Sequence, residues 1–486
     1  MLRNIHKAIE RFNSAIKYNE KIVIHSDIDP DGISATVIMY DYIKKLERKA
    51  LIAHAERSDG HGVVADQIDK DVDLLIIVDS SSSEVDEVNK LAEHMDVIIL
   101  DHHNVEESNI TLNAILVNPN QQGCEYPNKD ISGAGVTFRF IEALDYTYKK
   151  TNINRYLDLV GLSLLSDQMK MNNLENRYFV DKGMSKINNV GLLALIRANK
   201  HDPDKVNAQI MNFDIIPVLN TTTRNDEIKK AFSLLLENDY FKALKKAEYL
   251  IKDNKKRKEK VKELYKDYQQ NAILDKFVYA IDKNATKNYN GLVATKFAQD
   301  HHKPSFVLKD DGDIYQGSYR SYGDFDLQSF LKKCPYTMLA AGHPGAGGFK
   351  VKTKDFEAFR LYVDENIDNE LFKQVLEYDL ELTEEDLTWN LVNEIEKFDR
   401  IWGNSNPKIT VKINDVFVED REVFPQNNPS HTKIKADLFD SLKFNDADYA
   451  DDIGAWDKVH LLGNISINEW QGNKRVQLFI DDYRKN

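Results

Sequence analysis

The chain has 486 residues, which is too long for one hydrophobic core and indicates about three domains. Hydrophobic residues make up 42% of it and charged residues 30%, as in ordinary globular proteins, and no apolar run approaches the roughly 20 residues that span a bilayer. The net charge of −14 argues only mildly against nucleic acid as a partner, because an acidic protein can still gather basic side chains in one groove.

The first 21 residues, MLRNIHKAIERFNSAIKYNEK, are typical of an amphipathic helix and lack the apolar core of a signal peptide. Cys124 and Cys334 lie far apart, so they predict neither a disulfide framework nor a zinc site. We therefore expect a cytoplasmic protein without a membrane segment, and a monomer by default.

Between residues 21 and about 170, short apolar runs alternate with helical patterns. The runs KIVIHSD, DLLIIVDS, DVIILDHH and NAILVNP are rich in Ile, Val and Leu, as buried parallel strands are. Helical periodicity appears between them in GISATVIMYDYIKKL and SEVDEVNKLAEHM. This alternation predicts a parallel α/β sheet.

The second half of the chain changes character several times. A long helix is predicted around residues 234–270, and residues 252–262 hold seven Lys or Arg, either as a solvated face or as a stripe facing nucleic acid. The strand patterns KFVYAID, PSFVLKD and DIYQGSY around the helix pattern GLVATKFAQDHH predict a second, smaller α/β domain. Residues 354–402 look helical, and the last eighty or so alternate apolar and polar residues as a small antiparallel barrel does.

Acidic and histidine side chains follow three of the predicted strands. Asp27, Asp29 and Asp31 come after the first strand, Asp79 ends the second, and the run 101–103 (Asp-His-His) ends the third. In parallel sheets ligands gather beyond the carboxyl ends of the strands, so these groups should converge. A single Asp after a strand is often only a turn residue or a helix cap, whereas this whole group indicates a functional site.

Carboxylates combined with one or two imidazoles suit Mn²⁺ or Mg²⁺, and the imidazoles favour Mn²⁺. Two such ions, about 3.5–4 Å apart, can activate water and stabilise both oxygens of a phosphoryl displacement. One carboxylate must then bridge the ions, and Asp79, alone at its strand end, suits that role. Asp167 would add a ligand from a separate element.

Two glycine-containing segments can approach an anion. Ser132 and Gly133, at the start of the helical pattern ISGAGVTFRFIEAL, either cradle an anion or cap the helix. The segment AAGHPGAGG surrounds His343 with glycines, among them Gly342, so that backbone could come close to a phosphate. The pair 301–302 (His-His) is interpreted as the end of a helix.

With DHH in place at 101–103, the chain resembles the DHH phosphoesterase superfamily and, within it, the RecJ family of single-strand-specific 5′ exonucleases. The segments HSDIDPDGIS, IIVDSS, LDHHNV and LLSDQ are similar to its four metal-binding motifs. The resemblance implies metal binding by His25, Asp27, Asp29, Asp31, Asp79, His102 and Asp167. It implies catalytic roles for Asp79, His102, His103 and His343, with His103 beside the ligands or on a phosphate.

Other segments resemble RecJ in particular, and they imply the substrate contacts. These segments are AERSDGHGV, PVLNTTTR, GSYRSYGDFDL and GHPGAGGF, and the residues carried over are Arg57, Asn220, Arg224, Ser318, Arg320, Gly342 and His343. The segment LLGNISINEWQGNKRVQLFIDD is similar to an oligonucleotide-binding (OB) barrel, with Trp470, Lys474 and Arg475 as candidate contacts. Three positions depart from the family pattern, namely Val218 for Arg, Thr223 for Gly and His61 for Tyr.

The resemblance implies an α/β fold in five parts. These are a parallel-sheet DHH catalytic domain (1–215), linking helices (216–270), a smaller α/β DHHA1 domain (271–360), a helical connector (361–402) and a C-terminal OB-like β-barrel for nucleic acid (403–486).

The implied function is a 5′-to-3′ exonuclease that degrades single-stranded DNA to mononucleotides by two-metal-ion hydrolysis in DNA repair or recombination. Its partner is single-stranded DNA with a 5′ end, and a helicase or single-strand-binding protein stays open as a further partner. The alternative is a DHH phosphodiesterase for short oligoribonucleotides or cyclic dinucleotides, against which the barrel argues. A non-catalytic scaffold is disfavoured because the set of ligands is complete.

Overall fold

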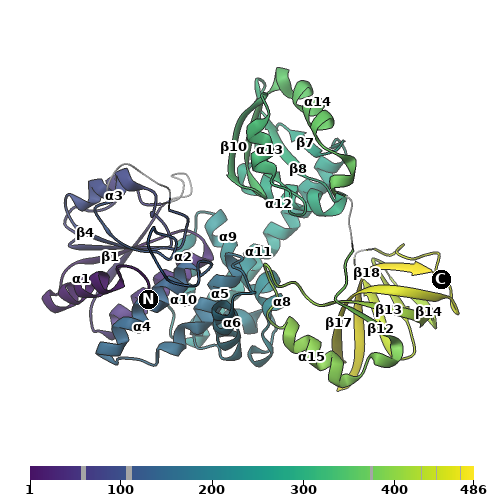
Figure 1. The fold of residues 1–486 in the computed structure, drawn as a ribbon, viewed down its shortest axis with the longest axis horizontal. Coiled ribbons are helices and arrows are strands. Elements are labelled where there is room, and N and C mark those ends of the chain that lie inside the picture. The colour runs from purple at the N-terminus through teal and green to yellow at the C-terminus, as the bar shows by residue number, and fades with distance from the viewer. Residues whose placement is uncertain are drawn as a thin grey trace. The chain divides into compact units, whose positions relative to one another are not determined.

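The computed structural model describes residues 1–55, 62–105, 112–372, 376–427, 429–444, 446–470 and 472–485. The chain divides into two compact units, drawn with all their elements in Figure 1. The first contains Met1–Leu250 together with Glu377–Asn486, and the second contains Ile251–Leu376.

The first unit contains a five-stranded parallel sheet with the strand order β2-β1-β3-β4-β5. All four apolar runs predicted as strands are present, and β2 is an additional, largely half-exposed edge strand. The bounds are β1 (Ile22–Ser26), β2 (Ala50–His54), β3 (Leu74–Val78), β4 (Asp96–Leu100) and β5 (Ile115–Val117).

Helices cover both faces of this sheet. Helix α2 contacts β1 and β3, and α4 contacts β3 and β4, while Val88 and Leu91 of α3 pack in one core cluster with Ile77 on the other face. Burial on both sides explains why the central strands are continuous apolar runs without alternation. The bounds are α1 (Ile5–Tyr18), α2 (Pro30–Lys45), α3 (Val85–Ala92) and α4 (Gly133–Tyr148).

A helical region follows the sheet and ends in the predicted long helix, α11. Its exposed side includes Lys255 and Lys258, whereas Arg257 is buried and donates to the carbonyl of Asn288 at 2.6 Å. The bounds are α5 (Leu157–Ser166), α6 (Leu174–Ser185), α7 (Val190–Ala198), α8 (Ala208–Ile210), α9 (Ile216–Arg224), α10 (Ile228–Leu235) and α11 (Tyr240–Gln269).

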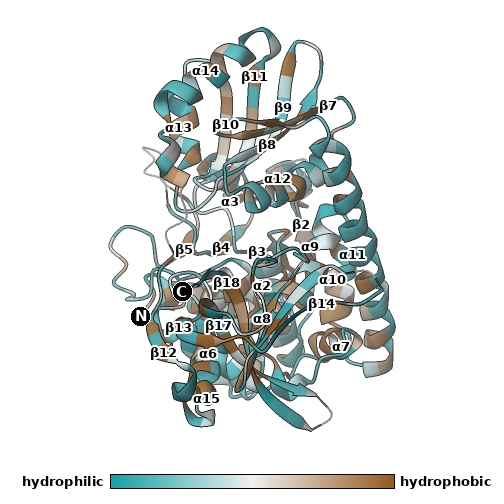
Figure 2. Cartoon of the chain, turned by 90° about the vertical axis from the view of Figure 1, so that its right-hand side faces the viewer, coloured by the Kyte–Doolittle hydropathy of each residue, from teal (hydrophilic) through white to brown (hydrophobic). Residues whose placement is uncertain are grey.

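The second unit is the predicted smaller α/β fold, with a six-stranded sheet in the order β10-β11-β9-β8-β7-β6. Only β7 and β8 pair in parallel, and their apolar stretches are brown in the hydropathy colouring of Figure 2. Its core is rich in aromatic rings such as Phe306 and Phe349. The bounds are β6 (Ile273–Leu274), β7 (Val278–Asp282), β8 (Ser305–Asp310), β9 (Ile314–Arg320), β10 (Thr337–His343), β11 (Ala346–Lys352), α12 (Lys287–His301), α13 (Leu327–Lys333) and α14 (Phe356–Asn366).

The C-terminal part of the first unit is a seven-stranded sheet in the order β12-β13-β17-β18-β16-β15-β14. Its predicted antiparallel pairing is only partly right, because β12 pairs with β13 and β16 with β18 in parallel. Strand β12 also lies in the segment expected to be helical. The bounds are β12 (Leu380–Thr383), α15 (Trp389–Asp399), β13 (Thr410–Phe417), β14 (Asp420–Phe424), β15 (His431–Lys435), β16 (Phe439–Lys443), β17 (Lys458–Trp470) and β18 (Asn473–Lys485).

No helix in the described ranges is both long and apolar enough to cross a membrane.

Candidate metal centre

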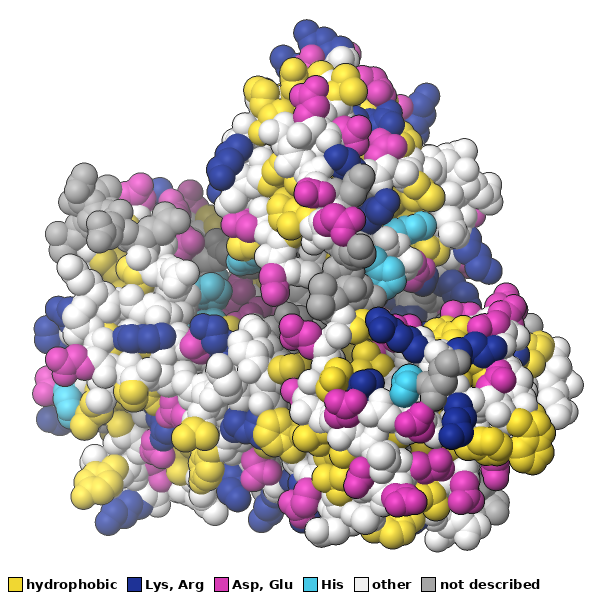
Figure 3. Space-filling model, turned by 45° about the vertical axis from the view of Figure 1, so that its right-hand side comes forward, with side chains coloured by type: hydrophobic (Ala, Val, Ile, Leu, Met, Phe, Trp, Pro, Cys, Tyr) yellow, Lys and Arg dark blue, Asp and Glu magenta, His cyan; other side chains and the backbone are white. Residues whose placement is uncertain are grey.

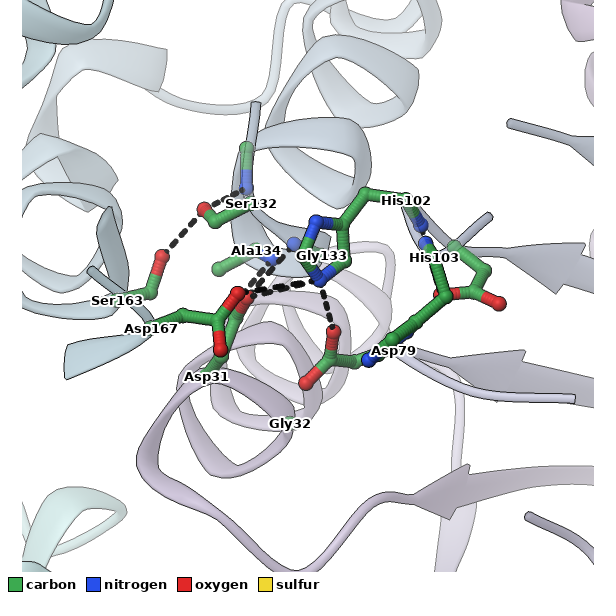
Figure 4. Close-up of polar contacts among 12 residues, drawn as sticks. Asp31, Gly32, Asp79, His102, His103, Ser132, Gly133, Ala134, Ser163 and Asp167 are labelled. Atoms are coloured by element: carbon green, nitrogen blue, oxygen red, sulfur yellow. Dashed lines mark hydrogen bonds and ion pairs between the residues drawn. The ribbon is translucent and has the colours of Figure 1, made fainter. Parts of the chain in front are cut away.

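The loops after β1, β3 and β4 bring the predicted acidic and histidine residues together. His102 lies at the centre of this cluster, as Figure 4 shows. Its Nε2 is 3.2 Å from Asp79 Oδ1, 3.4 Å from Asp167 Oδ2 and 3.8 Å from Asp31 Oδ2. Four separate chain segments therefore meet at one imidazole nitrogen.

Three sets of side chains among the described residues have the composition of a metal site. One is Asp79, Asp101, His102 and His103, and the other two share no residue with each other. Ligand atoms of Asp31, His102 and Asp167 lie within 4.8 Å of one another, and so do those of the set Asp27, Asp29 and Asp79. Because Asp79 also lies next to His102, these two sets adjoin. Oxygen ligands with one imidazole suit a hard or borderline divalent cation.

The carboxylates repel one another in a buried space. Asp79 is 1% exposed, and its two carboxylate oxygens have no hydrogen-bond partner within the described residues. Burial, with the charges of Asp31 and other cluster carboxylates added, raises the pKa of Asp79 well above its usual value. Burial and the neighbouring acids likewise raise the pKa of Asp29 and that of Asp167 to about 7. The cluster thus supports the binding of divalent cations, which would neutralise it.

The backbone around Asp79 is shaped to hold this side chain. Asp79 adopts a left-handed conformation with φ of 63°, and its N–H donates to the carbonyl of Leu100 at 2.9 Å. A Cβ atom added at Gly133 would lie 2.3 Å from Asp79 Oδ1. Glycine is therefore required at the start of α4 for the helix to come this close to the carboxylate.

The start of α4 binds Asp31, and Ser132 caps the helix, which is one of the two alternatives for this segment. The N–H groups of Gly133 and Ala134 donate to the two carboxylate oxygens of Asp31 at 2.8 and 2.7 Å (Figure 4). Ser132 Oγ accepts from the N–H of Gly135 at 3.1 Å. The predicted anion cradle exists, but its anion is a side chain of the protein.

Asp101 has a role that the sequence reasoning did not assign. It is fully buried and accepts hydrogen bonds from the N–H groups of Ser82, His102 and His103 and from His103 Nδ1, the last at 2.8 Å. Burial acts to raise its pKa, but the bond and charge of His103 outweigh burial and hold it below the usual range. The sequence pattern that could have indicated this role is an Asp directly before two residues, because an Asp side chain commonly accepts from the N–H groups that follow it in a turn.

The two histidines of the motif differ in charge. The hydrogen bond to Asp101 raises the pKa of His103 to about 9, and this side chain is 52% exposed. Burial lowers the pKa of His102, which favours the neutral imidazole that ligates metals. His25, at the end of β1, is also buried, which lowers its pKa to about 4, and it does not belong to any of the three metal sets among the described residues.

Helix α9 carries the segment PVLNTTTR and reaches the acidic loop. Asn220 and Arg224 are half-buried on this helix, and Val218 is a core residue with 1% exposure. Thr223 Oγ1 donates to the carbonyl of Ile28 at 2.5 Å. This bond joins α9 to the residue between Asp27 and Asp29.

Four predicted substrate residues lie in the second unit. Ser318 and Arg320 are on β9, and the Arg320 guanidinium donates from Nη1 to the carbonyl of Tyr319 at 2.7 Å. Burial lowers the pKa of Arg320. Gly342 and His343 are exposed at the end of β10, in the hairpin with β11.

Of the remaining predicted contacts, some lie outside the described residues and two lie in the β17–β18 hairpin. Arg57 and His61 lie outside the described residues, as does the side chain of Trp470. Lys474 lies 3.8 Å from Glu469 across the β17–β18 hairpin. Arg475 donates to the carbonyl of Ala436 at 2.6 Å and pairs with a carboxylate on β16, so its guanidinium is held within its own domain.

Two family profiles match the chain. Residues 21–164 match the DHH family, N-terminal domain, and residues 378–482 match the RecJ OB domain. The second match begins before β13 and includes β12, in accordance with the observed sheet.

Relatives match over nearly the whole chain. The single-stranded-DNA-specific exonuclease RecJ of Bacillus subtilis (strain 168) is 28% identical over 505 residues, which cover 99% of this chain and 63% of that protein. The prophage-derived YorK of the same strain, provisionally named a single-strand DNA-specific exonuclease, is 29% identical over 525 residues and is covered to 90%.

Among solved structures, RecJ of Thermus thermophilus in complex with Mn²⁺ is similar to this chain with a TM-score of 0.82. The match includes 100% of this chain and 72% of the Thermus thermophilus chain, and the two sequences are 21% identical. At this low sequence identity, the comparison shows that the two proteins share a fold.

Proposed function

The chain belongs to the DHH family in its RecJ type, and from this premise we propose that it is a metal-dependent exonuclease that degrades single-stranded DNA from the 5′ end. The proposed products are mononucleotides, and the proposed setting is DNA repair or recombination. The observation that carries the proposal is the buried cluster of carboxylates around His102, whose mutual repulsion divalent cations would relieve.

In this proposal two divalent cations occupy the cluster. Asp27 and Asp29 would hold one, Asp31, His102 and Asp167 would hold the other, and Asp79, which is close to both sets, would serve both ions. His25 supports the first set from the end of β1. Such a pair supplies a nucleophile formed from water at neutral pH and stabilises charge in an in-line displacement at phosphorus. Manganese is preferred because an imidazole is among the ligands, and relatives have been solved with Mn²⁺ and with Mg²⁺.

His103 acts as a cation beside the scissile phosphate. Its raised pKa, due to Asp101, keeps the imidazolium charged at neutral pH, and its exposed ring can reach a non-bridging oxygen. Asp101 fixes the ring through Nδ1, which leaves Nε2 as the donor to substrate.

The resemblance to RecJ assigns the polarity of the reaction to three residues that would recognise the 5′ phosphate, namely Arg57, Ser318 and Arg320. The forked guanidinium groups of the two arginines match the oxygens of a terminal phosphate. The backbone at Gly342 and the ring of His343 contact the scissile phosphate, and Asn220 with Arg224 contacts the strand near α9. The protein acts as a cytoplasmic monomer, and a helicase or single-strand-binding protein would supply its substrate.

A panel of substrates tests the proposal. With Mn²⁺ the protein is expected to degrade a long single strand, to leave a blunt duplex intact and to lose all activity in EDTA. Asp79→Asn serves as the inactive control. If long strands survive while dinucleotides or cyclic dinucleotides disappear, the small-substrate phosphodiesterase replaces the exonuclease. Absence of turnover on every substrate with the ions bound would establish a scaffold.

A further inference from the structure

A further strand end, that of β5, reaches the metal centre without contributing an acid or a histidine. The segment 118–121 (Asn-Pro-Asn-Gln) directly follows β5, and we call it the Asn loop. Because β5 pairs in parallel with β4, the Asn loop lies at the same edge of the sheet as the loops that carry the metal sets. The sequence reasoning predicted the strand but assigned no role to the residues after it.

Asn118 joins two loops of the metal centre to each other. This side chain is fully buried, and its Nδ2 donates both to the carbonyl of His103 and to Ser82 Oγ, at 2.9 Å in each case. Ser82 lies in the loop after β3 that begins with Asp79, and His103 lies in the loop after β4. One amide group therefore fixes the distance between these two loops.

Asn120 holds the neighbouring histidine in the same way. Its Nδ2 donates to the carbonyl of His102 at 2.6 Å and to the carbonyl of Lys129 at 3.2 Å. Lys129 precedes α4, the helix whose first turn approaches the acidic cluster, and its own Nζ donates back to the carbonyl of Pro119. The Asn loop is thus fastened both to the histidine and to the segment before α4.

The two asparagines also support each other. Asn118 Oδ1 accepts from the N–H of Asn120 at 2.7 Å, so the acceptor side of the buried amide is used as well as its donor side. Gln121 Nε2 donates to the carbonyl of Asn118 at 3.1 Å and to that of Leu116 at 2.9 Å. These bonds give the Asn loop a fixed conformation from which to hold the histidines.

Neutral amides suit this position because they add no charge to the cluster. Lys, Arg, Asp and Glu side chains are interspersed over the face of the molecule that Figure 3 shows, whereas the two groups that hold the histidine carbonyls are uncharged. A buried carboxylate in their place would add to the repulsion among the acids, and a buried cation would compete with a metal ion for them.

We propose that Asn118 and Asn120 are positioning residues of the metal centre. By holding the carbonyls of His103 and His102, they fix the backbone that aims one imidazole at the metal and the other at the edge of the site. The inference rests on the proposed function and deepens it. Groups that orient metal ligands from behind typically change metal affinity about 10- to 100-fold when they are removed.

Mn²⁺ binding by the full-length protein tests the proposal without turnover. Isothermal titration calorimetry gives the dissociation constant of Mn²⁺ for the wild type and for each variant. Asn120→Ala removes the donor to the His102 carbonyl, so the dissociation constant should rise about tenfold. Asn118→Ala should weaken binding at least as much, because it also releases the loop after β3. Since Asn118 is fully buried, the half-buried Asn120 is the position on which the test depends.

Asn189→Ala is the matched control for a loss of stability alone. Asn189 also joins two elements through both sides of its amide, accepting from the N–H of Leu192 and donating to the carbonyl of Leu235. It belongs to none of the metal sets among the described residues, so its replacement should leave Mn²⁺ affinity unchanged. Circular dichroism and thermal unfolding verify that each variant is folded. A folded Asn120→Ala protein with the affinity of the wild type would overturn the inference, as would an equal loss in the control.

A double-mutant cycle checks that Asn120 acts through His102. In a His102→Ala background the imidazole is already absent, so adding Asn120→Ala should change the Mn²⁺ dissociation constant by less than about twofold. A further tenfold loss in that background would show that Asn120 affects the metal by another route and would contradict its role as a positioning residue.

The outcomes for the two proposals are distinct. A wild type that binds Mn²⁺ and shows the expected losses, but cleaves no single-stranded DNA, contradicts the exonuclease and leaves the positioning role in place. A wild type that cleaves, with Mn²⁺ affinity indifferent to both Asn118→Ala and Asn120→Ala, contradicts the positioning role alone. Absence of Mn²⁺ binding by the wild type would contradict both.

Discussion

Asp79 combines three features that each cost stability. It is buried, its backbone is left-handed, and its carboxylate oxygens have no hydrogen-bond partner in the described part of the chain. Such unfavourable combinations persist at functional sites because the surrounding structure compensates for them. Here the compensation is expected from bound cations.

Asp79→Asn should therefore abolish cleavage and stabilise the metal-free protein. Asparagine tolerates the left-handed backbone and removes one of several mutually repelling charges. We expect the rate to fall about a thousandfold or more, because a bridging ligand is lost, and the metal-free protein to gain about 1 kcal/mol in stability at pH 8. Nuclease assays and thermal unfolding in EDTA measure the two effects, with Asp69→Asn on the surface as control. Retained cleavage would rule out the two-metal site.

Thr223 departs from the family pattern, and the structure supplies a reason for a hydroxyl there. Its bond to the Ile28 carbonyl holds the loop that carries Asp27 and Asp29. Thr223→Val keeps the shape of the side chain but loses its hydrogen bond to the Ile28 carbonyl. The dissociation constant for Mn²⁺ should then rise about fivefold, which corresponds to a loss of about 1 kcal/mol of binding free energy. Thr223→Ser should restore the affinity in isothermal titration calorimetry. Equal affinities in all three proteins would show that the bond does not position the loop.

The sequence located most cluster residues because strand ends in a parallel sheet share one edge. It could not identify the anion at the start of α4, because the same sequence pattern is expected whether the helix N-terminus binds a ligand or the Asp31 side chain. It passed over Asp101, because a carboxylate that accepts from its neighbours' N–H groups leaves only a local turn signal.

At the scale of elements, the N-terminus of α4 positions two acidic side chains. Its N–H groups hold Asp31, and the absence of a side chain at Gly133 admits Asp79. The first turn of α4 therefore positions the carboxylates of both Asp31 and Asp79, each of which belongs to a candidate metal site.

Gly133→Ala should disturb the positions of both acidic side chains. The added Cβ would overlap the Asp79 side chain, and overpacking of this kind costs about 1–3 kcal/mol. We expect weaker Mn²⁺ binding together with a lower unfolding temperature, measured by calorimetry and thermal unfolding. Gly348→Ala, where an added Cβ has only a contact at 3.9 Å, is the matched control and should behave like the wild type. Normal metal binding by Gly133→Ala would contradict the role assigned to this turn.

Among the elements that the sequence did not predict, β2 and β12 were missed for physical reasons. The edge strand β2 has the sequence ALIAH, largely half-exposed, and lacks the continuous apolar run of the central strands. Strand β12 is four residues long between helical segments, and it is a strand only because β13 pairs with it. Long-range pairing of this kind leaves little trace in local periodicity.

At the scale of the whole molecule, the acidic cluster links stability to pH and to metal. The folded-state pKa of Asp29 and that of Asp167 are raised to about 7 from 3.8, and that of His103 is raised to about 9 from 6.5. In each case the folded protein holds a proton that the unfolded chain releases at lower pH, so stability is lost as the pH rises.

The metal-free protein should therefore be less stable at pH 8.5 than at pH 6.5. Over this interval the loss comes from His103, whose pKa is 6.5 when unfolded and about 9 when folded, and from the part of the Asp29 and Asp167 titrations that lies near pH 7. Mn²⁺ should raise the unfolding temperature by several degrees, and more at the higher pH, because it binds the ionised carboxylates. Differential scanning fluorimetry with Mn²⁺ and with EDTA measures both effects. A metal-free protein that gains stability over this interval would contradict the assigned titrations.

The central claim is tested most directly by a time course on single-stranded DNA labelled at the 5′ end or the 3′ end, with Mn²⁺ and with EDTA. The account predicts immediate release of a labelled mononucleotide from the 5′-labelled strand, a ladder of shrinking fragments from the 3′-labelled strand, and no reaction in EDTA. Mononucleotide release from the 3′ label first, or internal fragments from both, would contradict a 5′ exonuclease.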